Sequence, residues 1–164
     1  MIDLITIFNT VSNASNSLAA VYEFLSEKAK TKDIDKSFVF RELKNNLKRL
    51  ENTNKKNVKL DKLILSLENT AILKAMKVGF NFNYLASKEI VVTEKLIIEK
   101  RNKRYLNWNC EKLVSSIESK IQVLKDSIQY FDDINKANTN FRLKLNNLYF
   151  QILLLVVLIN ESNK

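Results

Sequence analysis

The stretch that decides the fold is FRLKLNNLYFQILLLVVLI, residues 141–159. Within it, Gln151 is the only polar residue between Leu148 and Ile159. A helix on a protein surface needs one apolar stripe, whereas a helix that is apolar nearly all round is buried on most sides. The stretch therefore predicts a central C-terminal helix, around which other amphipathic helices pack.

The composition favours long helices with few corners. Proline is absent and glycine occurs once in 164 residues, although turns between strands are usually built with these residues. A hydrophobic content of 46% is enough to build a core. We expect one all-α domain over residues 1–164, an antiparallel bundle of about five long helices with the C-terminal helix central.

Two segments repeat their stripe residues at alternating steps of four and three, the spacing that keeps one side of a helix against a partner helix. They predict a first helix over Ile2–Lys30 and a later one from Cys110 to about Asn135. The same registers fit a coiled coil with a second copy of the chain. The stripes are Leu4, Phe8, Val11, Ser15, Leu18, Tyr22 and Leu25 in the first helix, and Cys110, Val114, Ile117, Ile121, Leu124, Ile128 and Phe131 in the later one.

Two further helices are predicted between these segments. One runs over Phe38–Glu51, capped by Asp33, Asp35 or Ser37, because their side-chain oxygens can accept the free N–H groups of a first turn. The other runs over Val58–Val78 and ends at Gly79, where a left-handed residue closes the last turn. The stripe of the first of these helices is Phe40, Leu43, Leu47 and Leu50.

The sequence from Phe80 to Asn109 is less regular. The aromatic segment Phe80–Leu85 is predicted to plug one end of the bundle, with base stacking as the alternative. Ser87–Lys100 is rich in β-branched residues, which favour strands, but it lacks turn residues and is interpreted as a helix. Arg101–Asn109 is expected to interrupt it. The cap of the last helix is expected at Asn138 or Thr139.

The residue types exclude most catalytic chemistry. Histidine is absent, which removes the commonest general base and metal ligand. One glycine leaves no room for a glycine-rich phosphate loop. Cys110 falls on an apolar stripe and is interpreted as a buried structural thiol. The acidic pairs Glu94 with Glu99 and Asp132 with Asp133 are interpreted as solvated surface groups. We therefore expect no enzyme, no metal site and no cofactor.

Charge and targeting signals narrow the partners. The chain has 27 Lys and Arg against 18 Asp and Glu, a net charge of +9, which attracts nucleic acid, anionic membranes and acidic proteins alike. A single cysteine excludes an internal disulfide and fits a reducing compartment. The N-terminal sequence MIDLITIFNTVSN is a poor signal peptide. The C-terminal apolar run is about 12 residues, short of the roughly 18 that span a membrane. We expect a cytoplasmic protein.

Positive charge is densest over Lys36–Lys62, which holds nine basic and three acidic residues. If two helices of this region are antiparallel neighbours, their loop end forms a basic knob that suits a phosphate backbone. A solubilising surface is the competing interpretation. The candidate contact residues, with two from the later basic segment, are Arg41, Lys44, Lys48, Lys55, Lys56, Lys59, Lys62, Arg101 and Arg104.

Three functions remain. The first is a non-catalytic helical interaction module, an adaptor, regulator or neutralising partner of another protein, of bacterial or phage type, whose partner is another protein or a second copy. The second is a nucleic-acid-binding bundle that uses Lys36–Lys62. The third is a membrane-active bundle that exposes the apolar last helix to an anionic membrane. The third function requires Leu153–Leu158 to be exposed. If these residues are not buried within one chain, they mark a surface that binds a partner or a membrane.

Overall fold

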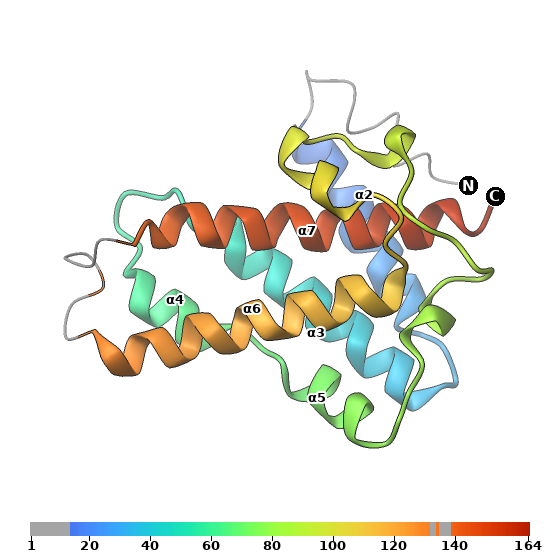
Figure 1. Cartoon of the computed structure of the whole chain (residues 1–164), viewed down its shortest axis with the longest axis horizontal. Coiled ribbons are helices and arrows are strands. Elements are labelled where there is room, and N and C mark those ends of the chain that lie inside the picture. The colour runs from blue at the N-terminus through green and yellow to red at the C-terminus, as the bar shows by residue number, and fades with distance from the viewer. Residues whose placement is uncertain (1–13, 132–133, 135–138) are drawn as a thin grey trace.

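The computed structural model describes residues 14–131, 134 and 139–164, and this part of the chain contains helices and no strand, which confirms the all-α class (Figure 1). Four of its α-helices are long and two are short. The α-helices are α2 (Ala14–Lys28), α3 (Ile34–Leu50), α4 (Leu60–Ser66), α5 (Thr70–Lys77), α6 (Cys110–Tyr130) and α7 (Phe141–Glu161). Three 3-10 helices complete the described elements: η1 (Phe82–Leu85), η2 (Glu94–Leu96) and η3 (Lys100–Tyr105).

Helix α7 is the central element, as its composition predicts. It contacts α3, α6, η2 and η3, and Figure 1 shows it running the length of the molecule beside α6. Every residue from Gln151 to Asn160 is buried within this one chain. By length and composition α7 could cross a membrane, yet 67% of its most apolar window is buried inside the protein. No apolar face is therefore left exposed along Gln151–Asn160.

The first part of the bundle is the helical hairpin of α2 and α3. The Asp33 side chain accepts a hydrogen bond from the Lys36 backbone N–H, which confirms the predicted cap. The predicted stripe of α3 is buried from Phe40 to Leu50. In α2, Val21 and Leu25 are buried. The predicted stripe residues Leu4, Phe8 and Val11 lie outside the described residues.

The predicted single helix over Val58–Val78 is wrong, because the chain breaks into α4 and α5 at Leu67–Asn69. Two buried side chains of α3 impose the break. Asn46 donates to the Glu68 carbonyl at 2.6 Å and accepts from the Glu68 N–H at 2.8 Å. Glu42 accepts from the first N–H groups of α5. These bonds replace the helical bonds that a continuous helix would make across the break.

The end of α5 follows the prediction. Gly79 has φ +71°, its N–H donates to the Met76 carbonyl, and the Phe80 N–H donates to the Ala75 carbonyl. This pair of bonds defines the glycine-terminated helix end that the sequence predicts. Phe82 is buried against the start of α6, as a plug requires, and Phe80 meets it edge to face.

The predicted helix over Ser87–Lys100 is also wrong. This segment is irregular apart from η2 and the first residue of η3, which fits consecutive β-branched residues, since these lose side-chain freedom in a helix. It does not form the alternative strand pair; instead Val92 donates to the Trp108 carbonyl and accepts from the Asn107 N–H. η3 lies within the interruption expected at Arg101–Asn109.

The α6–α7 pair differs from the prediction at its turn. Helix α6 ends at Tyr130, several residues before the expected end near Asn135. Helix α7 is capped by Asn140, whose side chain accepts from the Leu143 N–H, not by Asn138 or Thr139. Asn135, Asn138, Asp132 and Asp133 lie outside the described residues. The buried stripe from Cys110 to Leu124 is confirmed.

Candidate interaction surfaces

The structure does not place all the predicted basic residues at the loop between α3 and α4. Helix α4 begins at Leu60, so Lys55 and Lys59 precede it and do not share a helical face with Lys62. Lys56 lies in the same exposed turn as Lys55. Arg41 is three turns of helix from that loop, so it is too remote to extend a cluster there.

Two of the three predicted contact residues on α3 hold the α2–α3 hairpin together. Lys44 donates to the Ser26 hydroxyl at 2.7 Å, and the Lys48 ammonium lies 5.4 Å from the centre of the Tyr22 ring. Both contacts cross from α3 to α2. The structure thus gives Lys44 and Lys48 a packing role that the charge pattern alone does not reveal.

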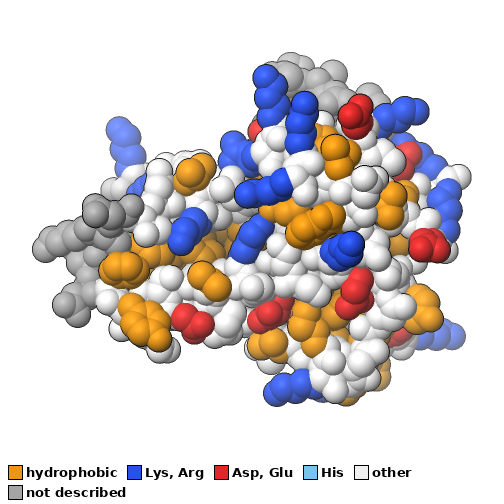
Figure 2. Space-filling view, in the orientation of Figure 1, with side chains coloured by type: hydrophobic (Ala, Val, Ile, Leu, Met, Phe, Trp, Pro, Cys, Tyr) orange, Lys and Arg blue, Asp and Glu red, His pale blue; other side chains and the backbone are white. Residues whose placement is uncertain are grey.

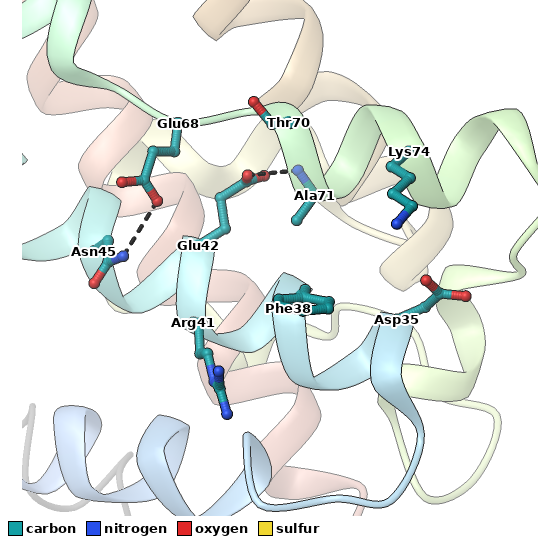
Figure 3. Close-up of a pocket in the computed structure, with 9 residues that line it drawn as sticks. All are labelled: Asp35, Phe38, Arg41, Glu42, Asn45, Glu68, Thr70, Ala71 and Lys74. Atoms are coloured by element: carbon teal, nitrogen blue, oxygen red, sulfur yellow. Dashed lines mark hydrogen bonds between the residues drawn. The ribbon is translucent and has the colours of Figure 1, made fainter.

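Arg41 lines a groove between α3 and α5, which we call the α3–α5 groove (Figure 3). Its volume is about 380 Å³. Phe38 lies in the groove and is 46% exposed, and the neighbouring Ile34 is 68% exposed. The lining residues are Asp35, Phe38, Arg41, Glu42, Asn45, Glu68, Thr70, Ala71 and Lys74.

Two of the acids that line this groove, Glu42 and Glu68, are engaged in hydrogen bonds within the protein. Glu42 is only 4% exposed and accepts hydrogen bonds from the backbone N–H groups of Ala71 and Ile72 at 2.7 and 3.1 Å. Burial raises the pKa of Glu42 above its usual value. Burial acts in the same direction on Glu68, but hydrogen bonds from Arg49 and Asn45 outweigh it and lower the Glu68 pKa.

The groups at the groove surface are free of such partners. Arg41 and Lys74 are exposed and form no ion pair with an acidic residue in the described part of the chain. The Arg41 guanidinium lies 5.8 Å from the centre of the Phe38 ring. The accessible surface of the groove therefore combines an aromatic ring, an arginine and a lysine with the part-exposed carboxylate of Asp35.

A second hollow, the basic pocket, lies between η3, α6 and α7 and has a volume of about 270 Å³. Figure 2 shows Lys and Arg side chains gathered over the middle of the face on which α6 and α7 lie, with apolar atoms between them. Arg101 adjoins the pocket, donating to the Asn147 side chain at 3.2 Å. The residues that line the basic pocket are Arg104, Ser119, Lys120, Val123, Leu124, Lys144 and Asn147.

The basic pocket explains the one polar residue in the apolar run. The Gln151 side chain is fully buried and its oxygen accepts from both the Tyr105 hydroxyl and the Lys120 ammonium. Lys120 also donates to the Tyr105 hydroxyl. Burial, reinforced by the nearby Arg104, lowers the pKa of Lys120 to about 8.

Sequence reasoning found only part of this pocket. Arg101 and Arg104 were predicted contact residues because they stand in a short basic segment. Lys120 and Lys144 were missed, since each is a single lysine on an amphipathic helix and has no local pattern to mark it. The unexpected glutamine at 151 is the signal that points to a buried polar partner for α7.

The described residues hold no cluster of metal-ligating side chains. No three Cys, Asp or Glu side chains there lie close enough together to hold a metal ion. Cys110 is buried, and burial raises its pKa to about 12, so its thiol stays protonated and unreactive. Comparison with protein-family models, curated proteins and solved structures gives no match.

Proposed function

We propose that the protein is a non-catalytic interaction module that binds a helical segment of a partner protein in the α3–α5 groove. The observation that carries this proposal is Phe38, a large aromatic side chain left 46% exposed beside Arg41. Aromatic and arginine side chains are enriched in protein interfaces and supply most of their binding energy. The role fits an adaptor, regulator or neutralising partner acting in the cytoplasm.

The charges of the groove specify the partner segment. Glu42 and Glu68 are engaged by α5, Asn45 and Arg49, so the cations Arg41 and Lys74 remain available to a partner, beside one part-exposed carboxylate, that of Asp35. We infer that the segment carries an apolar anchor that packs on Phe38 and acidic side chains that meet the cations. The net charge of +9 favours the same class of acidic partner through faster encounter.

Affinity purification with nuclease treatment, from cells of the source organism, tests this proposal. We expect a protein that stays bound after nuclease treatment and is lost from the variants Phe38→Ala and Arg41→Glu. Interface anchors of this kind cost about 2 kcal/mol or more when removed, which corresponds to about thirty-fold weaker binding.

Leu65→Ala is the matched control, because Leu65 is 58% exposed on α4 and does not line the groove. It should retain the partner. If Leu65→Ala and Phe38→Ala lose the partner equally, the contact lies outside the groove. If nuclease treatment releases everything that copurifies with the protein, the partner is nucleic acid.

Nucleic-acid binding is the alternative function. The observation in its favour is the exposure of Lys55, Lys56, Lys59 and Lys62 along the turn into α4. Sequence-independent binding to a phosphate backbone predicts a gel shift in about 50 mM salt that disappears by about 200 mM. Charge reversal at Lys55 and Lys59 should abolish it. A complete absence of shift at low salt would remove this alternative.

A further inference from the structure

The basic pocket brings together three positively charged side chains that have no acidic partner among the described residues. Arg104 reaches it from η3, Lys120 from α6 and Lys144 from α7. No acidic residue lines the pocket, and none of the three cations forms an ion pair with an acid of the described residues. Three cations from separate elements around one hollow make an attractive site for an anion.

Two of these cations contact the same aromatic ring. The Arg104 guanidinium carbon and the Lys120 ammonium nitrogen lie 5.1 and 5.0 Å from the centre of the same Tyr105 ring. Lys120 is further fixed by its hydrogen bond to Gln151. Arg104 contributes to the lowered pKa of Lys120, so the two charges repel one another, and an anion that contacts both would relieve the repulsion. The cations are thus positioned before any ligand arrives.

The other residues that line the pocket indicate what else the ligand contains. Ser119 and Asn147 supply neutral hydrogen-bonding groups. Val123 is 52% exposed, and the buried Leu124 lies beside it in the lining. Ligand sites commonly combine such an apolar surface with a few polar groups that fix orientation. The pocket therefore suits an anionic group attached to an apolar body.

We propose that the basic pocket binds a phosphate monoester, with the phosphate held by Arg104, Lys120 and Lys144 and the apolar body packed on Val123 and Leu124. A phosphate monoester carries a charge of about −1.5 to −2 at neutral pH. This charge balances three cations better than the single negative charge of a carboxylate does. An arginine fork also suits phosphate geometry. The site shares no lining residue with the α3–α5 groove, so it stands or falls independently of the proposed function.

Isothermal titration calorimetry tests the site with phenyl phosphate as the probe, and with inorganic phosphate, benzoate and a single-stranded oligonucleotide that has no terminal phosphate as comparison ligands. We expect phenyl phosphate to bind more tightly than inorganic phosphate or benzoate. Arg104→Gln and Lys144→Gln should each weaken its binding at least tenfold. Lys112→Gln is the matched control, since Lys112 is exposed on α6 outside the pocket, and should leave the affinity unchanged.

Three results would overturn the proposal. One is the absence of phenyl phosphate binding up to about 10 mM, a concentration that reveals even weak sites. Another is binding that Arg104→Gln and Lys144→Gln leave intact while both variants remain folded by circular dichroism. The third is tight binding of the oligonucleotide alone, which would assign the surface to nucleic acid backbone.

The pH dependence supplies a second readout. The groups that face Lys120 are Arg104 and Tyr105 from η3, Lys144 from α7 and the neutral Gln151. The Lys120 pKa is lowered to about 8, and burial raises that of Tyr105, which stays neutral. Phenyl phosphate affinity should therefore fall severalfold as the pH rises through 8. Lys120→Arg keeps its charge and should remove this fall; a fall of equal size in the variant would contradict the assignment.

Discussion

The break between α4 and α5 rests on Asn46, which makes its removal a sharp test of the fold. The Asn46 side chain is fully buried and pairs with both the N–H and the carbonyl of Glu68. In Asn46→Ala those two backbone groups lose their partner in a part-buried position. Each unpaired buried group costs about 1–3 kcal/mol, so we expect the free energy of unfolding to fall by about 2–6 kcal/mol.

Such a loss is large for a domain with a total stability of about 5–15 kcal/mol. Urea unfolding followed by far-UV circular dichroism measures it. With a denaturant slope of about 1–3 kcal/mol per molar urea, a loss of about 3 kcal/mol lowers the midpoint by about 1–3 M. The shift should appear in the midpoint with little change in the slope.

Asn45→Ala is the control for this experiment. Asn45 is exposed and makes one hydrogen bond, at 3.1 Å, to the Glu68 carboxylate. We expect its loss to change the stability by no more than about 0.5 kcal/mol. If Asn46→Ala were as mild as Asn45→Ala, the reasoning that tertiary hydrogen bonds impose the break would be refuted.

Three further predictions concern single positions. Gly79→Ala should cost about 1–2 kcal/mol in urea unfolding, because φ +71° is unfavourable for a residue with a Cβ; no atom lies within 4 Å of the added Cβ, so a larger loss would point to another cause. Glu42 has a raised pKa in the folded protein, so the native state binds more protons and its stability should fall as pH rises from 4.5 through that pKa. The free energy of unfolding of the wild type, measured relative to that of Glu42→Gln, should fall as the pH rises. A difference that stays constant or rises with pH would contradict this prediction. Cys110 should react with iodoacetamide far more slowly in the native protein than in urea, since its thiol is buried and its pKa is raised to about 12; equal rates would disprove its burial.

Local patterns predict the long helices and the core because both depend on the spacing of apolar residues. The run Gln151–Ile159 is buried as its composition requires, and the buried stripe from Cys110 to Leu124 follows its four-three register. Caps also follow from short patterns, as Asp33 and Gly79 show. These features involve residues a few positions apart.

The failures arise where distant residues decide the backbone. The helix over Val58–Val78 breaks because Asn46 reaches Glu68 across 22 positions of sequence. The basic pocket needs Arg104, Lys120 and Lys144 to meet from three elements, and no window of sequence contains that arrangement. A lone buried glutamine signals that α7 has a polar partner without identifying Lys120 or Tyr105.

The most direct test of the proposed role is photocrosslinking from the α3–α5 groove in cells of the source organism. A photoreactive benzoyl-phenylalanine replaces Phe38 in one variant and Leu65 of α4, which is somewhat more exposed, in the other. We predict a protein adduct from position 38 that survives nuclease treatment and is absent from position 65. The same adduct at both positions, an adduct that nuclease removes, or none from position 38 would contradict the proposal.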